Sequence, residues 1–295
     1  MGRFDGVMIS SQYMPKESDE GKMGRFDGVM ILTDMDGTLL NSQRQLSRGN
    51  QEAARYFMEQ GGLFSVATGR AKRAMEYFMP ELAINAPAVL FNGSVVYDFE
   101  KNAPVWEKPL EEKTAWDFAR DMMERFPFLG FEVFLADGEF VARSNPITEK
   151  HFVSIRLPLV ERPLEKIPQP WVKFNLTGEP EKMGPVAEYA QKKYGEEYFM
   201  QFSSPYFYEV MAKGANKGTG AQTVCRIKGI DKGHLYTLGD NLNDKELMEC
   251  AALSFAPENA APAIQEIAGR ILPHCDNDTL AAAVQVLEGI YPGNL

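Results

Sequence analysis

Short apolar runs alternate with amphipathic stretches along most of this 295-residue sequence. An uninterrupted apolar run predicts a buried strand, whereas apolar residues spaced three and four apart predict a helix. Asn92-Gly93 is a hairpin turn sequence, so the strand before it is expected to return as an antiparallel partner. In the first third of the chain the pattern predicts strands at 29–33, 63–67, 88–91 and 94–97 and helices at 47–60, capped by Ser47, and 71–79.

The pattern changes after about residue 98 and changes back after about residue 212. In between, tight turns such as Asp137-Gly138 join the predicted strands, and prolines interrupt a connector at 158–170. Antiparallel strands with flanking helices are typical of an α+β unit. The elements predicted there are helix 111–125, strands 131–135, 139–142 and 171–176, helix 181–194 and strand 198–202.

Strand–helix alternation resumes in the last third of the chain. The elements predicted there are helix 217–228, strand 234–238, helix 243–250, strand 253–256, helix 262–268, strand 270–272 and helix 278–288. We therefore predict an α/β fold in which a Rossmann-like parallel sheet core is interrupted by an inserted α+β cap domain. Residues 23–97 and 206–295 form the predicted core, and residues 98–205 form the predicted cap.

The first nine residues recur without change at 23–31, and a polar stretch separates the two copies. The repeat is too short to be a solenoid unit. We expect residues 1–22 to be an N-terminal extension, disordered or left by cloning or a misassigned start codon, with the functional chain beginning near Met23. The alternative is that the first copy acts as a decoy for the first strand and perturbs folding.

Composition and charge narrow the function classes. The chain is 44% hydrophobic and 24% charged, with a formal net charge of −10. An acidic chain disfavours nonspecific binding to nucleic acids or anionic membranes, although a bound metal can still make a local site attractive to anions. The sequence contains no apolar run long enough to span a bilayer and no secretory signal. We expect a cytoplasmic protein with no nucleic-acid, membrane or obligate protein partner.

The cysteines Cys225, Cys250 and Cys275 are widely spaced and form no Cys-x-x-Cys motif. We expect buried, inert thiols, because free cysteine is among the most buried residue types. A zinc site that combines them with His234 or His274 is the less favoured alternative.

The most informative segment is Asp34-Met35-Asp36-Gly37-Thr38, directly after the first predicted strand. Open α/β sheets bind ligands at the carboxyl ends of their strands. Side chains two positions apart in an extended chain share a face, so Asp34 and Asp36 can reach one pocket. Two carboxylates repel each other unless a cation or a shared proton offsets their charge. The segment predicts an aspartate nucleophile, a neighbouring acid–base group and a bound metal.

Two further segments offer groups that bind anions. Thr68-Gly69-Arg70 follows the second predicted strand, where a hydroxyl can donate to a phosphate oxygen and glycine lets the backbone come close. Helix capping explains Thr68 equally well. Lys217 lies at a predicted helix start, where the helix dipole disfavours a cation. Judged in isolation, Lys217 is best explained as a solvated surface lysine.

The strand predicted at 234–238 ends in the run Gly-Asp-Asn-Leu-Asn-Asp at 239–244. A helix cap would need only Asn243 or Asp244. The run holds more oxygen ligands than one cap needs, and hard carboxylate oxygens suit Mg²⁺. The sequence therefore predicts a magnesium site that includes Asp240 and Asp244.

The motifs, and the order in which they occur along the chain, resemble those of the haloacid dehalogenase superfamily. Within it, they resemble those of the Cof-type sugar phosphatases. The resemblance covers about 23–290, strongly in the core and weakly in the insert. The tail segment 275–280 departs from a Gly-Val segment that is frequent in the family. The matching segments are 34–40, Thr68-Gly69-Arg70, Lys217, 239–244, Phe91-Asn92-Gly93 and 256–260.

The resemblance implies a role for each core motif. Asp34 would attack phosphorus and form an aspartyl-phosphate, and Asp36 would protonate the leaving oxygen and then deprotonate water. Thr68 and Lys217 would stabilise the transferring phosphoryl group. The residues expected to contact substrate are Gly37, Thr68, Gly69, Asn92, Lys217 and Asn243.

The resemblance also implies a metal and a cap. Mg²⁺ would be held by Asp34, the backbone carbonyl of Asp36 and Asp240, with Asp244 acting through water or by orienting the other ligands. The cap would close over the core and select the leaving group. Cap contacts to substrate are predicted among Arg143, Lys173, Asn175 and Tyr208, although an exposed face or a core edge is the commoner setting for each, and His151 has no evident partner.

The predicted function is Mg²⁺-dependent hydrolysis of small phosphorylated metabolites, with sugar phosphates first among them. One alternative is a phosphomutase-like phosphotransferase, which would keep both acids. The other alternative is a noncatalytic protein that binds a phosphorylated ligand.

Overall fold

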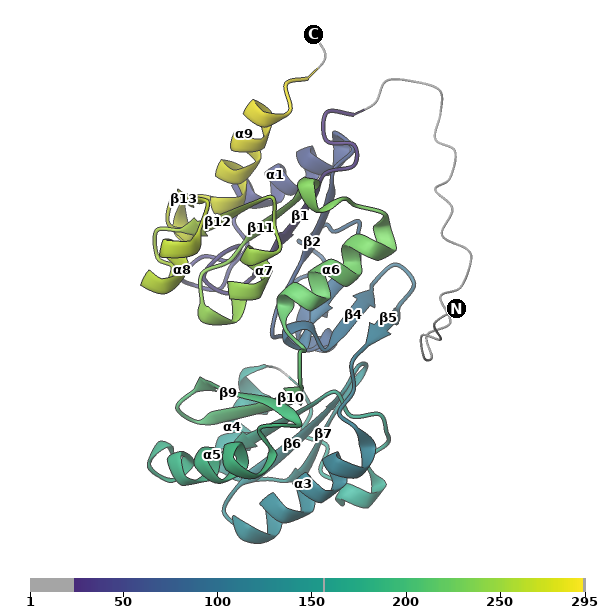
Figure 1. Ribbon diagram of the computed structural model, residues 1–295, viewed down its shortest axis with the longest axis vertical. Coiled ribbons are helices and arrows are strands. Elements are labelled where there is room, and N and C mark those ends of the chain that lie inside the picture. The colour runs from purple at the N-terminus through teal and green to yellow at the C-terminus, as the bar shows by residue number, and fades with distance from the viewer. Residues whose placement is uncertain (1–23, 156, 294–295) are drawn as a thin grey trace.

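The computed structural model describes residues 24–155 and 157–293. The described chain forms two lobes, each built around its own sheet (Figure 1). One sheet has five parallel strands in the order β13-β12-β11-β1-β2, and the other has five antiparallel strands in the order β7-β6-β8-β10-β9. This confirms the predicted α/β fold with a parallel core and an inserted α+β unit. The predictions for 1–22 fall outside the described residues.

The register of the parallel sheet brings three strand ends to one level. Thr33 of β1 pairs with both Val66 of β2 and Leu238 of β11. The residues that follow these three strands therefore meet at the same edge of the sheet. The strands are β1 (Met30–Thr33), β2 (Leu63–Val66), β11 (Leu235–Leu238), β12 (Leu253–Pro257) and β13 (Arg270–Leu272).

Helices cover both faces of this sheet. α1 and α9 share an apolar cluster with Ile31, whereas α6 and α7 pack with Met30 and Leu32 on the other face. β1 is therefore apolar on both sides, as is typical of a buried parallel strand. The Ser47 hydroxyl accepts from the backbone N of Asn50 and caps α1, as predicted. The helices of this lobe are α1 (Arg48–Glu59), α2 (Lys72–Glu76), α6 (Lys217–Lys228), α7 (Lys245–Glu249), α8 (Pro262–Ile267) and α9 (Thr279–Ile290).

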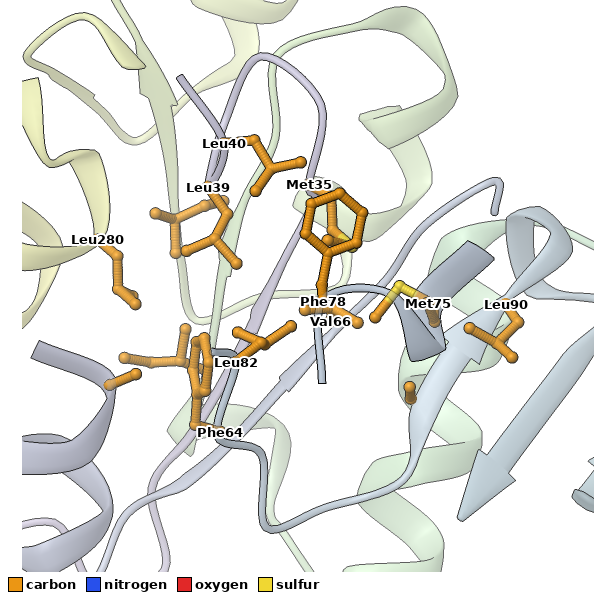
Figure 2. Packing of buried hydrophobic residues seen from close by; sticks show 14 of the residues in the cluster. Met35, Leu39, Leu40, Phe64, Val66, Met75, Phe78, Leu82, Leu90 and Leu280 are labelled. Carbon is orange, nitrogen blue, oxygen red and sulfur yellow. The ribbon is translucent and has the colours of Figure 1, made fainter. Parts of the chain in front are cut away.

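The loop after β1 is anchored in an apolar cluster. Met35, Leu39 and Leu40 lie in the same cluster as Phe64 and Phe78 (Figure 2). Met35 is fully buried between the two acids of the loop. Burial of such a side chain contributes roughly 1.5–3 kcal/mol. The apolar residues thus fix the backbone that carries the acids.

A three-stranded antiparallel ribbon, β3-β4-β5, continues from the edge of the parallel sheet through a bridge between Ala67 and Val89. Asn92 and Gly93 lie in the turn between β3 and β4 with φ values of 52° and 98°, which confirms the predicted hairpin. β5 was not predicted, because Pro104 argues against a strand except at an edge. The strands are β3 (Ala88–Leu90), β4 (Val95–Asp98) and β5 (Ala103–Glu107).

The second lobe, called the cap lobe here, is an antiparallel sheet with helices packed on one face. Phe131, Phe174 and Val210 belong to the apolar cluster that this face shares with α3 and α5. The sequence pattern did not predict α4 or β10. The elements are α3 (Glu112–Arg125), β6 (Gly130–Leu135), β7 (Gly138–Arg143), α4 (Pro146–Ser154), β8 (Lys173–Thr177), α5 (Pro180–Tyr194), β9 (Tyr198–Ser204) and β10 (Phe207–Ala212).

Two strands lie across the domain boundaries drawn from the sequence. β5 falls within 98–205 but pairs with β4 of the core lobe, and β10 falls within 206–295 but lies between β8 and β9 of the cap lobe. Lys108 N still donates to Ser94 O, whereas Leu110 N donates to Trp171 O. The chain therefore enters the cap lobe about ten residues later than drawn and leaves it after β10. Among the described helices, none combines the length and the apolar character that a bilayer crossing requires.

Candidate active site

Asp34 and Asp36 follow β1 but have different surroundings. The backbone N of Asp34 donates to Leu238 O at 2.8 Å, which extends the pairing of β1 with β11 by one residue. The Asp34 side chain is buried, whereas the Asp36 side chain is 45% exposed. Arg70 donates to both oxygens of Asp36, from Nε at 2.8 Å and from Nη2 at 2.6 Å. One acid is therefore enclosed, and the other is oriented at the surface by a cation.

Lys217 joins two buried carboxylates. Its Nζ lies 2.6 Å from Asp34 Oδ1 and 2.6 Å from Asp244 Oδ1, and its side chain is 1% exposed. The interpretation of Lys217 as a solvated surface residue is therefore wrong. Asn216 caps α6, and Lys217, the first residue of the helix, is enclosed. Burial opposes the charge of Lys217, but the Asp244 and Asp34 carboxylates outweigh it and raise its pKa.

The acidic residues form a compact corner. Carboxylate oxygens of Asp34, Asp240 and Asp244 lie within 4.8 Å of one another. Burial raises the pKa of Asp34 well above its usual range despite the opposing charge of Lys217, and burial together with the charge of Asp244 raises the pKa of Asp240. One lysine does not balance three acids in a buried corner. Hard oxygen ligands at this spacing fit a divalent cation such as Mg²⁺.

Hydrogen bonds hold this corner in place. Thr38 Oγ1 donates to Asp240 Oδ1 at 2.9 Å, and the backbone N atoms of Asp240 and Asn241 each donate to Asp244 Oδ2 at 3.0 Å. Gly37 has a φ of +84°, and a Cβ atom there would lie 2.6 Å from Asp240 Oδ2. Only glycine combines this backbone conformation with such a close approach. The corner is thus preorganised.

A second cluster of polar residues lies beside this corner, and its members come from the loop after β2, the hairpin turn and the loop after β11. Asn92 N donates to Thr68 O at 3.0 Å, and Asn243 Nδ2 donates to Asn92 Oδ1 at 3.1 Å. The Thr68 hydroxyl accepts from Arg70 N at 3.2 Å. Thr68 does not cap α2, because the residue before that helix is Ala71. The capping interpretation of Thr68 is therefore wrong for α2, and its anion-binding role stays a prediction.

A cavity of about 730 Å³ lies between the two lobes. Lys217, Asp244 and Gly37 are not on its wall and act through the contacts with Asp34 and Asp240 described above. The predicted site residues on the wall are Asp34, Asp36, Thr68, Gly69, Asn92, Asp240 and Asn243.

The cap lobe closes the other side of this cavity. Lys173 and Asn175, two of the candidate substrate contacts, line it. Tyr208 instead belongs to the apolar cluster of the cap lobe, and Arg143 donates to Phe126 O, so neither residue lies on the wall. Strand parity places Tyr208 on the helix-covered face, so the core-edge setting that the sequence favoured applies to it.

Sequence reasoning missed three polar residues of the cap lobe. His151 Nδ1 lies 2.9 Å from Glu132 Oε1, although the sequence showed no partner for it. Glu209 accepts from Asn92 Nδ2 at 3.1 Å and from Lys173 Nζ at 2.5 Å. A single glutamate inside an apolar strand, as in β6 and β10, is the signal that points to such residues, because a buried carboxylate needs partners.

The cysteines fit the expectation of inert thiols. Burial raises the pKa of Cys225 and of Cys250 to about 11. Cys275 lies beside His274 and Asp276, and their ligand atoms lie within 4.8 Å of one another. Asp276, however, accepts from the backbone N and the hydroxyl of Ser42, so local loop contacts account for its position.

Comparisons with known proteins agree with this geometry. Residues 31–284 match the family of haloacid dehalogenase-like hydrolases. The chain is 25% identical over 250 residues to the putative phosphatase YxeH of Bacillus subtilis. The aligned region covers 81% of this chain and 90% of that protein. The chain is 24% identical over 261 residues to an HMP-PP phosphatase of Escherichia coli, which covers 84% of this chain and 91% of the relative.

Solved structures share the fold. A haloacid dehalogenase-like hydrolase from Bacteroides thetaiotaomicron superposes with a TM-score of 0.78 at 23% identity, over 88% of this chain and 99% of that one. The HAD subclass IIB sugar phosphatase BT4131 superposes with a TM-score of 0.74 at 18% identity, over 88% and 98%. The resemblance inferred from the motifs is therefore confirmed: this chain belongs to the haloacid dehalogenase-like hydrolase family and is an enzyme of the phosphatase type.

Proposed function

We propose that this protein hydrolyses small phosphomonoesters with the help of Mg²⁺ and through a phosphorylated Asp34. The observation that carries the proposal is the position of one buried carboxylate. Asp34 lies on the cavity wall, 2.6 Å from Lys217 Nζ and within 4.8 Å of the Asp240 and Asp244 oxygens. A nucleophile beside fixed positive charge is what displacement at a phosphate dianion requires.

Asp34 is the proposed nucleophile. An oxygen of its carboxylate forms a bond to phosphorus, and the bond from phosphorus to the ester oxygen breaks. Burial favours the protonated carboxyl, whereas the Lys217 ammonium favours the ionised, attacking form. The lysine therefore has two functions, because it also balances the negative charge that the incoming phosphate adds to the corner.

Asp36 is the proposed acid and base. Its carboxyl gives a proton to the departing alkoxide, and the resulting carboxylate then removes a proton from the water that hydrolyses the aspartyl-phosphate. These two proton transfers leave Asp36 as it began. The two hydrogen bonds from Arg70 orient the Asp36 side chain on the cavity wall.

The remaining core residues hold the phosphate. Thr68, through its hydroxyl, and Gly69, through its backbone, are proposed to contact phosphate oxygens, and Asn92 and Asn243 border the same position. Mg²⁺ would be held by Asp34, the carbonyl of Asp36 and Asp240, with Asp244 fixing the loop. When bound, it would neutralise phosphate charge and align the oxygens for in-line displacement.

The cap lobe is proposed to shield the reaction from water and to contact the leaving group. Relatives named as an HMP-PP phosphatase and a sugar phosphatase act on small phosphorylated compounds. We extend this class to the present chain, with sugar phosphates as the first candidates. A cytoplasmic location and the absence of an obligate protein partner remain predictions from the sequence.

The test is release of inorganic phosphate from a panel of metabolite monophosphates, with Mg²⁺ and with a chelator. We expect release only with the metal and a loss of at least about 10³-fold in Asp34→Asn. Phosphate that appears on a second hydroxyl instead of in solution would favour the mutase. Binding of a monophosphate without turnover would favour the noncatalytic alternative, and full activity in Asp34→Asn would refute the mechanism.

A further inference from the structure

The two faces of the cap sheet have opposite chemical character. One face is apolar and packs against α3 and α5. The other face carries Glu132, Lys173, Asn175 and Glu209, and the last three line the cavity. None of these four residues is more than 6% exposed. Charged and amide groups buried to this extent on a sheet face are unfavourable unless other polar groups satisfy them.

Strand register sets these residues side by side. Asn175 on β8 lies directly opposite Glu132 on β6 and Glu209 on β10. Lys173 lies two residues before Asn175 on β8 and therefore shares its face. Asn175 Nδ2 donates to Glu132 Oε2 at 2.8 Å, and Lys173 Nζ donates to Glu209 Oε1 at 2.5 Å. The amide and the ammonium are thus held rigidly by carboxylates on the neighbouring strands.

These internal contacts leave a defined set of hydrogen-bonding positions. Asn175 Oδ1 is buried and accepts no hydrogen bond from the described residues. The Glu132 carboxylate can only accept, so His151 Nδ1 is the donor in this contact. Lys173 Nζ has three protons and uses one of them for Glu209. This wall therefore offers the Asn175 amide oxygen as an acceptor beside the Lys173 ammonium as a donor.

The same wall is unfavourable for a second anion. Two carboxylates, Glu132 and Glu209, accompany a single lysine, and Lys173 is already paired with one of them. A phosphate or carboxylate on the leaving group would compete with Glu209 for Lys173 and would lie near Glu132. Among the described residues of the cap sheet face, Lys173 is the only buried cation, and the arginines on the cavity wall, Arg44 and Arg70, belong to the core lobe. The carboxylates of Glu132 and Glu209 therefore repel a leaving group that carries a second anion.

We propose that Asn175 and Lys173 select a leaving group that carries neighbouring hydroxyls and no second anionic group. One hydroxyl donates to Asn175 Oδ1 and another accepts from Lys173 Nζ, while the scissile phosphate lies at Asp34. A cavity of about 730 Å³ accommodates a sugar or polyol monophosphate in this orientation. The inference rests on the proposed function and adds to it the class of leaving group and the residues that recognise it.

Matched substrate pairs test the selection in the unmodified full chain with Mg²⁺. Glycerol 3-phosphate differs from 3-phosphoglycerate by a carboxylate, and fructose 6-phosphate differs from fructose 1,6-bisphosphate by a phosphate. We expect kcat/KM to be at least about 100-fold higher for the member without the second anion in both pairs. Glycerol 3-phosphate should also exceed propyl phosphate, which lacks the hydroxyls. A second-anion member that is hydrolysed equally well or better would overturn the proposal.

Two variants test the residues. Asn175→Leu removes the acceptor at similar size, and Lys173→Met removes the donor at similar length. We expect the ratio of kcat/KM for fructose 6-phosphate to that for acetyl phosphate, which has no hydroxyl, to fall at least about tenfold in each. Glu188→Gln, at an exposed cap position away from the cavity wall, should leave the ratio unchanged. An unchanged ratio in both Asn175→Leu and Lys173→Met would overturn the assignment.

The outcomes separate this inference from the proposed function. Normal acetyl phosphate hydrolysis with an unaltered ratio would refute the cap assignment alone. Failure of the wild-type chain to hydrolyse acetyl phosphate or any monophosphate would refute the proposed function and the inference with it. If Asn175→Leu does not fold, Lys173→Met and the substrate pairs still test whether the cap residues select the leaving group.

Discussion

The Nε atom of Arg73 on α2 lies 3.6 Å from Oε2 of Glu139 on β7, and this ion pair joins the core lobe to the cap lobe. The Glu139 side chain is 3% exposed, and neither of its oxygens accepts a hydrogen bond from a described residue. The Arg73 side chain is 47% exposed. The cation paired with this buried carboxylate is thus itself about half in solvent.

This pair predicts how stability changes with pH. Burial outweighs the effect of Arg73 and raises the pKa of Glu139 from 4.5 to about 6. The folded protein therefore holds this proton more tightly than the unfolded chain, and the stabilisation is full below pH 4.5 and lost as the pH rises through about 6. We expect Glu139→Gln to match wild type near pH 4 and to exceed its free energy of unfolding by up to about 2 kcal/mol above pH 7.

Urea unfolding of both proteins at several pH values measures this difference. Glu149→Gln, on an exposed position of α4, is the control and should differ from wild type by an amount that does not depend on pH. A Glu139→Gln protein that is less stable than wild type above pH 7 would show that the attraction to Arg73 outweighs burial.

Lys217 is expected to support both stability and activity. Lys217→Met leaves Asp34 and Asp244 buried without their shared cation, so we expect a loss of about 3–5 kcal/mol in stability at pH 8. Phosphate release should fall by at least about 10²-fold, because the fixed positive charge at phosphorus is lost. Added Mg²⁺ should recover part of the stability, since a cation that binds only the folded protein stabilises it.

Thermal unfolding with and without Mg²⁺ measures both effects of the Lys217 substitution. Lys192→Met, at an exposed position near the end of α5, is the control and should change neither quantity appreciably. Wild-type stability in Lys217→Met would contradict the pairing of Lys217 with the two acids.

Thr38 is expected to tune metal affinity without touching the metal. Its hydroxyl orients Asp240, so Thr38→Val should weaken Mg²⁺ binding by about 10-fold or more. Thr237 on β11 provides a matched comparison, because its hydroxyl is buried without a hydrogen-bond partner among the described residues. Thr237→Val should leave Mg²⁺ affinity unchanged and should be neutral or stabilising by about 1 kcal/mol.

Calorimetric titration of Mg²⁺ into each threonine variant decides the matter. Equal Mg²⁺ affinities in Thr38→Val and wild type would show that the Thr38–Asp240 contact does not position the ligand.

Arg70 is expected to position Asp36 for proton transfer. Arg70→Ala removes both contacts to the carboxylate, so kcat should fall by about 10–100-fold, with a smaller change in KM. Arg70→Lys keeps the charge but cannot reproduce the two parallel hydrogen bonds to Asp36. Its kcat should therefore lie between those of wild type and Arg70→Ala. Steady-state kinetics on one monophosphate test this. A higher kcat in Arg70→Ala would mean that the ion pair restrains Asp36.

The local part of the site could be predicted from the sequence. Asp34 and Asp240 follow apolar runs that form β1 and β11, and parallel strands bring their carboxyl ends to one edge. The helix cap at Ser47 and the hairpin turn at Asn92-Gly93 could also be predicted, because capping and hairpin turns depend on residues a few positions apart. The resemblance to a known family then supplied roles that spacing alone does not.

Other parts depend on contacts between distant residues. Judged in isolation, Lys217 was interpreted as a solvated lysine, because its partner Asp34 lies 183 positions away in sequence. The resemblance to the family alone gave it a role at the phosphate. Glu132 and His151 showed no relation, since a helix that was not predicted brings them together. β5 was missed because its proline is tolerated only at the edge position that the fold gives it.

The sequence by itself determined which residues could carry phosphoryl chemistry and at which strand ends they lie, because strand periodicity and turn chemistry are local. Only the tertiary structure decided which face of the cap sheet meets the cavity. A shift of one residue in register reverses every side chain of a strand, so Asn175 faces the cavity while Tyr208 packs among apolar residues. The balance of charge around Asp34 was likewise decided by packing, since Asp34, Lys217 and the Asp240–Asp244 pair come from three segments that meet only in the folded chain.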